Sequence, residues 1–168
     1  MADFITRVGI GFDVHRFDTM AHEDNFVILG GVKVPYVYKL IAHSDGDVLL
    51  HALTDALLGS MALGDIGDHF PPTDQKWRNA NSKVFLKHAM DLVANKGGSI
   101  VNIDVVVITE KPKLMFYKQK IKESIAEMLA LNDELVSVKA TTTEKLGFTG
   151  RQEGIAVQAI CAVKVELN

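Results

Sequence analysis

Two short segments combine carboxylates and imidazoles at spacings that could build a metal site. Asp13 and His15 lie two residues apart in an alternating apolar stretch, and side chains at i and i+2 of a strand share one face. His51 lies on a predicted helix, with Asp55 one turn further along the same face. Two histidines, one carboxylate and an open fourth position are typical of catalytic zinc. Asp13, His15 and His51 are therefore candidate zinc ligands.

Each of these patterns also has a purely structural interpretation. An Asp-x-His pair at the end of a strand is more often just an exposed strand end. Asp47, His51 and Asp55 recur every fourth residue, and most such helical faces are simply solvated. Histidine is an uncommon choice for solubility alone, which favours metal binding. Asp55 could instead orient a ligand or contact a substrate.

Candidate phosphate-binding residues lie at the ends of predicted elements. His43 and Ser44 precede a predicted helix, and the unpaired N–H groups at a helix start attract phosphate. Thr141 and Thr142 end a predicted strand and offer hydroxyl and N–H donors, although a threonine-rich turn is usually only a turn. Glu144 could hold a hard cation such as magnesium through oxygen. The sequence has no Walker motif, complete dinucleotide fingerprint or calcium-loop spacing.

The predicted elements alternate between strands and helices. Gly30 and Gly31 between apolar runs predict a β-hairpin. Ser44 or Asp45 is expected to cap the first helix, and Ser82 the second. Strands are expected over 8–14, 26–29, 32–35, 100–109, 136–143 and 155–165, helices over 46–63, 82–95 and 114–130, and a long loop over 65–81. This order predicts an α/β (α+β) sandwich with a mixed four-stranded sheet, a helical layer on one face and an early hairpin. The last strand is apolar at nearly every position and needs cover on both faces, so we expect a homo-oligomer.

The bulk composition indicates a single globular domain, 1–168. Its 48% of apolar and 23% of charged residues are ordinary for a soluble protein. The net charge of -3, without a Lys/Arg cluster, argues against a nucleic-acid partner. The sequence shows no signal or transit segment and no membrane-length apolar run, so we expect a cytoplasmic protein with no membrane partner. Cys161, within an apolar run, is expected to be a buried, inert thiol.

Taken together, these segments resemble the cyclodiphosphate synthase family over about 7–165. The resemblance is carried by 9–15, 42–47 with 51–55, 64–67 and 139–151. It implies two metal sites, with zinc at Asp13, His15 and His51 and magnesium (or manganese) at Glu144. It also implies that His43 and Ser44 bind substrate phosphates, that Asp65 and Gly67 bind the ribose, and that Thr141 and Thr142 bind the cytidyl phosphate. The cytosine would lie near Lys113, Leu114 and Met115, with further substrate contacts at Asp55, Phe148 and Arg151.

The resemblance also implies an assembly and a reaction. Family members are homotrimers whose sheets pack around the threefold axis and whose active sites lie between subunits. The implied substrate is the small cytidyl diphosphate 4-diphosphocytidyl-2-C-methyl-D-erythritol 2-phosphate, which closes to a cyclic diphosphate and releases CMP. Two departures concern the long loop over 65–81, which is expected to act as a lid, and the axial cavity. The lid has Pro71-Pro72 where the family often has Pro-Asp, and Gln158 stands where some members have a glutamate lining the cavity.

Two other functions fit parts of the sequence. A zinc-dependent nucleotide hydrolase would use the same metal group, with Asp55 as the best candidate for a base that activates water. A trimeric nucleotide-sensing regulator would share the sandwich but would need no metal group. Trapping the product separates the first alternative from a cyclase, and bound zinc counts against the second.

Overall fold

The computed structural model describes residues 3–71 and 73–167, so Pro72 of the expected lid lies outside the described residues. The elements in chain order are β1 (Phe4–Arg16), β2 (Phe26–Leu29), β3 (Val32–Pro35), α1 (Val48–Ser60), α2 (Ile66–His69), η1 (Gln75–Trp77), α3 (Lys83–Asn95), β4 (Gly98–Ile108), α4 (Lys118–Leu129), η2 (Asp133–Leu135), β5 (Val136–Thr141), α5 (Gly147–Gly150) and β6 (Gly154–Glu166).

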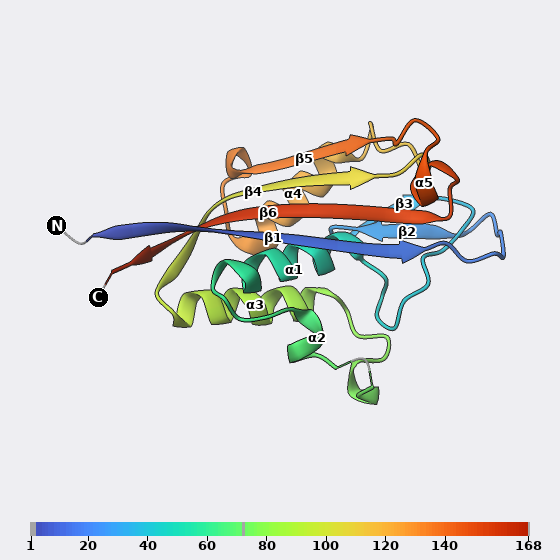
Figure 1. The fold of residues 1–168 in the computed structure, drawn as a ribbon. Helices are drawn as coiled ribbons and strands as arrows, with labels where there is room; N and C mark the ends of the chain where they lie inside the picture. The colour runs from blue at the N-terminus through green and yellow to red at the C-terminus, as the bar shows by residue number, and fades with distance from the viewer. Residues whose placement is uncertain (1–2, 72, 168) are drawn as a thin grey trace.

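One mixed four-stranded sheet organises the chain. Its strand order is β1-β6-β4-β5, with β4 and β5 parallel and the other neighbours antiparallel. Helices α1 and α4 lie against one face, and α3 packs on α1 (Figure 1). The hairpin β2–β3 forms a separate two-stranded sheet. The predicted sandwich, mixed sheet, helical layer and early hairpin are confirmed. Although β5 and β6 are consecutive in sequence, β4 lies between them.

The two faces of the sheet differ in burial because the strand side chains alternate. On β6, Ile155, Val157 and Ala159 face the helices and are fully buried. On the opposite face, Val8 of β1 is 65% exposed and Phe12 is 56% exposed. This second face therefore presents apolar side chains that the single chain does not cover. Cys161 is buried on the helical side, as expected.

The start of α1 differs from the sequence-based expectation. The helix begins at Val48 and its N-cap is Asp47, whereas Ser44 and Asp45 lie in the preceding loop. Asp47 is fully buried, so the prediction that it shares a polar face with His51 and Asp55 is wrong. Its carboxylate accepts hydrogen bonds from the backbone N–H groups of Leu50 (3.1 Å), Gly30 (2.9 Å) and Gly31 (2.6 Å), which tie the hairpin turn to the helix. No sequence-local signal marks the two long-range contacts.

Several other elements also differ from expectation, and β1 is longer at both ends than the expected 8–14. The segment 65–81 is not an unstructured loop, because it contains α2 and η1. The helix expected from residue 114 begins at Lys118, after a turn in which the backbone N–H of Tyr117 donates to the carbonyl of Leu114. The strand expected to reach residue 143 ends at Thr141. No helix formed by the described residues has the length and apolar character to span a membrane.

Replacing Asp47 by Asn should destabilise the fold. The amide keeps one acceptor oxygen but turns an N–H₂ group toward backbone donors, so at least one backbone N–H loses its acceptor and faces another donor. The expected loss in the free energy of unfolding is about 1–3 kcal/mol. Urea unfolding of the wild type and of Asp47→Asn would measure it, with the exposed Asp24→Asn as the matched control. Equal stabilities would show that the carboxylate does not hold the hairpin to α1.

Candidate active site

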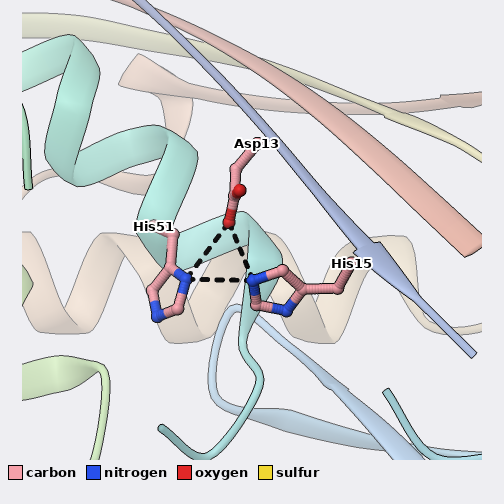
Figure 2. Close-up of side chains that lie close together, drawn as sticks. All are labelled: Asp13, His15 and His51. Atoms are coloured by element: carbon pink, nitrogen blue, oxygen red, sulfur yellow. Dashed lines mark hydrogen bonds and ion pairs between the residues drawn. The ribbon is translucent and has the colours of Figure 1, made fainter. Parts of the chain in front are cut away.

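Three predicted ligands converge where β1 and α1 meet. Figure 2 shows Asp13 and His15 on β1 pointing toward His51 on α1. Asp13 Oδ2 lies 3.0 Å from His15 Nε2 and 3.1 Å from His51 Nδ1, and the two nitrogens are 3.3 Å apart. All three residues are partly buried. The two-residue spacing on the strand and the first turns of α1 thus bring the three groups together, as the sequence predicted.

The separations between these atoms match the requirements of a metal ion. With zinc–ligand distances of about 2.0–2.2 Å, two ligands of a tetrahedral site lie about 3.3–3.6 Å apart. The observed 3.0–3.3 Å triangle needs only small adjustments to reach that size. Nitrogen and carboxylate oxygen are also the donor atoms that zinc commonly takes. Asp13, His15 and His51 are therefore a group that could hold a metal ion.

The electrostatics of the group favour an ionised carboxylate. Burial alone would raise the pKa of Asp13, but the hydrogen bonds and positive charges of His15 and His51 outweigh it and hold that pKa well below its usual range. His15 Nδ1 lies 3.2 Å from the carbonyl oxygen of Gly46, which can only accept. Nδ1 of His15 therefore carries a proton, so Nε2, which faces Asp13, is the nitrogen that would give its lone pair to a metal ion.

A pocket of 370 Å³ opens beside the three residues. Its wall also contains His43, Ser44 and Gly67, so these predicted phosphate and ribose residues lie beside the metal group. The N–H groups of Val48, Leu50 and His51 at the start of α1 already donate to Gly46 and Asp47, and His43 and Ser44 lie several residues earlier. The start of α1 therefore offers few free N–H donors beside these two residues.

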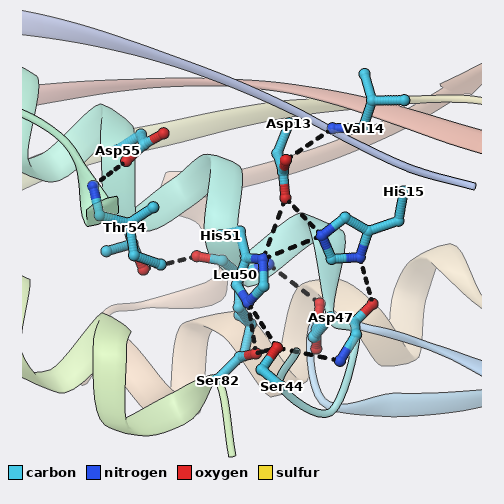
Figure 3. Close-up of polar contacts among 12 residues, drawn as sticks. Asp13, Val14, His15, Ser44, Asp47, Leu50, His51, Thr54, Asp55 and Ser82 are labelled. Atoms are coloured by element: carbon cyan, nitrogen blue, oxygen red, sulfur yellow. Dashed lines mark hydrogen bonds and ion pairs between the residues drawn. The ribbon is translucent and has the colours of Figure 1, made fainter. Parts of the chain in front are cut away.

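Asp55 and Asp65, also predicted to contact the substrate, hold the start of the lid in place. Asp55 accepts a 2.7 Å hydrogen bond from the N–H of Ile66, which ties α1 to the start of α2 (Figure 3). Burial raises the pKa of Asp55, while the Ile66 bond opposes that rise. Asp65 caps α2 in a reciprocal arrangement with Asp68. Both carboxylates thus have structural partners in this chain.

The predicted cytidine residues form a separate pocket of 440 Å³. Pro112, Leu114 and Met115 come from the turn before α4, while Thr141 ends β5 and Thr142 follows it. Lys113 and Thr109 complete much of its wall. Two sequence segments that the resemblance assigned to one nucleotide therefore do meet in space.

Glu144, Phe148 and Arg151 lie beyond the end of β5. Glu144 is exposed in a left-handed conformation (φ 52°) and accepts a 3.1 Å hydrogen bond from the Thr142 hydroxyl. Phe148 lines a cavity of 620 Å³ with Tyr38, while the exposed Arg151 pairs with Glu153 at 2.8 Å. Within one chain, these residues line neither the metal pocket nor the cytidine pocket.

Sequence reasoning missed several residues at the metal site. Phe70, Trp77 and Phe85 form an aromatic wall of the metal pocket, with the Phe70 and Phe85 ring centroids 4.6 Å apart. Ser82 was interpreted only as a helix cap, yet its side chain makes no capping bond and instead contacts His51 Nε2 at 2.9 Å. Aromatic residues in the 65–81 segment were the one available signal for a folded lid. No local pattern marks the Ser82 contact.

A histidine pair joins the lid to α3. His69 Nε2 lies 2.9 Å from the Leu63 carbonyl, so it donates there, and His69 Nδ1 accepts from His88 Nε2 at 3.1 Å. Burial and the neighbouring His69 lower the pKa of His88 below its ordinary 6.5, with Asp91 opposing. The unfolded chain therefore binds a proton on His88 more tightly than the folded chain does. The pair's stabilisation is present above pH 6.5 and is lost as the pH falls below it.

The variant His88→Gln should accordingly show a weaker pH dependence of stability, because its amide can still donate to His69 but cannot be protonated. Denaturant unfolding midpoints at neutral and mildly acidic pH would measure the difference. His22→Gln is the control, since His22 is exposed. The same acid destabilisation in wild type and His88→Gln would contradict the role given to His88.

Comparisons with known proteins agree with this architecture. A model of the YgbB family matches residues 6–164. A 2-C-methyl-D-erythritol 2,4-cyclodiphosphate synthase from Ectopseudomonas mendocina (strain ymp) is 55% identical over 154 residues, covering 92% of this chain and 96% of that protein. The bifunctional IspDF from Campylobacter jejuni has a TM-score of 0.90 and 48% identity, covering 97% of this chain and 43% of that one. The Plasmodium falciparum IspF, solved as a CDP complex, has a TM-score of 0.82 and 33% identity, covering 97% of each.

The fold and the site define an α/β sandwich enzyme with a two-histidine, one-carboxylate group that could bind a metal ion. The chain belongs to the YgbB family and is an enzyme of the cyclodiphosphate synthase class. The resemblance inferred from the sequence motifs is thereby confirmed.

Proposed function

We propose that this chain, as a single domain over 1–168, converts 4-diphosphocytidyl-2-C-methyl-D-erythritol 2-phosphate to 2-C-methyl-D-erythritol 2,4-cyclodiphosphate and CMP. The observation that carries the proposal is the convergence of Asp13, His15 and His51 beside a pocket that also contains His43 and Ser44. This constellation occurs in a chain that is 55% identical to a synthase named for that product.

The proposed binding residues form two groups, one for each end of the substrate. Asp13, His15 and His51 would hold zinc, with His43 and Ser44 on the phosphates beside it. Asp65 and Gly67 would hold the ribose, and Asp55 would add a further substrate contact. Lys113, Leu114 and Met115 would surround the cytosine, Thr141 and Thr142 would contact the cytidyl phosphate, Glu144 would hold magnesium or manganese, and Phe148 and Arg151 would add further contacts. Bound there, the cations would neutralise and polarise the phosphate groups.

The reaction forms one phosphorus–oxygen bond and breaks another. An oxygen of the substrate's own 2-phosphate attacks the β-phosphorus, and the oxygen that bridges to the α-phosphorus leaves with CMP. This nucleophile is already an anion at neutral pH, so no side-chain base is required. The work of the protein is to hold both ends of a flexible molecule in line. Such positioning supplies up to roughly 7–11 kcal/mol in ideal intramolecular reactions.

We also propose that the chain works as a homotrimer in the cytoplasm, with the uncovered sheet faces packed around the axis. Val8 and Ile10 are 65% and 60% exposed on the outer face of β1, and Ile160 of neighbouring β6 is 41% exposed. Contiguous apolar surface of this kind is typical of an interface. The metal and cytidine pockets of one chain have no lining residue in common, which supports sites completed by an adjacent subunit. A sedimentation mass of three times 18.4 kDa is expected, and a mass of 18.4 kDa would contradict the trimer.

The activity is tested by CMP release from the diphosphocytidyl substrate, with and without a chelator. We expect rapid release in the presence of zinc and magnesium, loss on chelation and recovery when both ions are restored. A rate that survives complete metal removal would contradict the metal-dependent mechanism. Absence of CMP at saturating metal would contradict the reaction itself. No described contact specifically favours the hydrolase or the regulator, and the candidate base Asp55 is bonded to the lid N–H of Ile66.

A further inference from the structure

Ser82 makes contacts that its position at the start of α3 does not explain. It is fully buried, and its side chain gives no capping bond to the helix. Its hydroxyl donates to Asp45 Oδ1, and its backbone N–H donates to Asp45 Oδ2 at 3.1 Å. The same hydroxyl oxygen lies 2.9 Å from His51 Nε2 (Figure 3). A chain of hydrogen bonds thus runs from the Asp45 carboxylate through Ser82 to a proposed metal ligand.

The chemistry of these groups settles the direction of each bond. An ionised carboxylate only accepts, so the one hydroxyl proton of Ser82 goes to Asp45. The Ser82 oxygen is then left as an acceptor, and His51 Nε2 must carry the proton between them. The remaining nitrogen of His51, Nδ1, is consequently the one that would give its lone pair to a metal ion. That atom is the one that faces Asp13 Oδ2 at 3.1 Å.

Asp45 is itself held in place, which gives the chain of bonds a fixed anchor. Its backbone N–H donates to the carbonyl of Ala80 at 3.1 Å, and its Oδ1 accepts from the N–H of Asp47 at 3.3 Å. Asp45 therefore bridges the loop before α1 and the segment before α3. The orientation of the His51 ring is tied to the packing of both helices.

Ser44 competes for the same histidine proton. Its hydroxyl oxygen is 3.1 Å from His51 Nε2 and 3.5 Å from the Ser82 oxygen. Unlike Ser82, Ser44 has no carboxylate partner in the described structure, and it lines the metal pocket. When Ser82 accepts the hydrogen bond from His51 Nε2, the Ser44 hydroxyl is free to donate into the pocket. The two serines thus have separable tasks.

We propose that Ser82 and Asp45 are positioning residues that keep His51 in the Nε2–H tautomer and aim its Nδ1 at the metal, leaving Ser44 to the substrate. The inference rests on the proposed metal site and deepens it. Partners of this kind on metal-binding histidines typically contribute about 10–100-fold in metal affinity. Neither residue touches the metal or the substrate in this proposal.

The test compares zinc affinity in Ser82→Ala, Asp45→Asn and the matched control Ser44→Ala. Competition with a chromogenic chelator should show zinc binding weakened about 10–100-fold in Ser82→Ala and in Asp45→Asn. In the second variant the amide cannot accept from both the hydroxyl and the N–H of Ser82. Ser44→Ala should keep the wild-type zinc affinity and show a raised KM instead. Circular dichroism of the metal-free variants checks that each one folds.

The histidine tautomer provides a readout that a general loss of stability would not move. Long-range proton–nitrogen NMR spectra of zinc-saturated, histidine-labelled protein report which ring nitrogen carries a proton and which one binds the metal. The His51 signal, assigned by its absence in His51→Gln, should be Nε2–H in the wild type and mixed in Ser82→Ala. Wild-type zinc affinity and an unchanged tautomer in folded Ser82→Ala would overturn this inference alone. A wild type that binds no zinc would overturn the metal site and this inference with it.

Discussion

Replacing His51 by Ala is expected to abolish turnover and zinc binding while leaving the cytidine end of the site able to bind nucleotide. His51 Nδ1 lies 3.1–3.3 Å from both other proposed ligands, so its removal opens the three-ligand group. A catalytic metal contributes several kcal/mol of charge stabilisation. At about 1.36 kcal/mol per tenfold, the rate should fall on the order of 10³-fold or more.

Three measurements on His51→Ala separate the metal role from misfolding. CMP release gives the rate, elemental analysis gives bound zinc, and calorimetric titration with CDP reports the nucleotide pocket. His22→Ala is the matched control, because the His22 side chain is 69% exposed and lines neither the metal pocket nor the cytidine pocket. Normal activity in a zinc-free His51→Ala protein would contradict the assignment of the metal group.

Replacing Gly11 by Ala should both destabilise the fold and disrupt the metal group. A Cβ on Gly11 would lie 1.8 Å from the carbonyl oxygen of Ala52 and 2.7 Å from the nitrogen of Ala56. Both are backbone atoms of α1, so the helix must move away from β1. We expect a loss of about 3 kcal/mol in the free energy of unfolding. Because β1 carries Asp13 and α1 carries His51, their separation should grow and zinc affinity should fall.

Gly59 offers the matched control within the same helix. A Cβ there would lie 3.7 Å from the Ile10 carbonyl oxygen, which is ordinary contact, and the residue is exposed. Since alanine is a better helix former, Gly59→Ala should stabilise the protein by up to about 1 kcal/mol and keep its zinc affinity. Thermal melts and zinc titrations of the two variants test both statements. A Gly11→Ala protein as stable as Gly59→Ala would refute close packing of α1 on β1.

The predictable part of the site follows from local geometry. The i and i+2 spacing of Asp13 and His15 on a strand places them on one face, and the structure confirms their convergence with His51. The hairpin followed from Gly30 and Gly31, which adopt positive φ values of 58° and 77° at the turn. These features need only the periodicity of a strand, the pitch of a helix and the conformational freedom of glycine.

The unpredicted part depends on contacts between distant segments. Asp47 looked like a helix-face residue, but its carboxylate is taken by the hairpin turn, 16 and 17 residues away. Ser82 looked like an ordinary cap, but its hydroxyl joins Asp45, 37 residues away. Periodicity carries no information on such pairs. The roles given to Glu144, Phe148 and Arg151 stay predictions, because one chain does not bring them to the metal group.

The central claim is that the substrate's own phosphate, and not water, attacks the β-phosphorus. It is tested most directly by running the reaction in ¹⁸O-labelled water and following the products by phosphorus NMR, where each bound ¹⁸O shifts its phosphorus signal. Intramolecular closure predicts one cyclic diphosphate and CMP, both free of ¹⁸O. An open-chain product or a CMP that carries ¹⁸O would show attack by water and would contradict the cyclase mechanism.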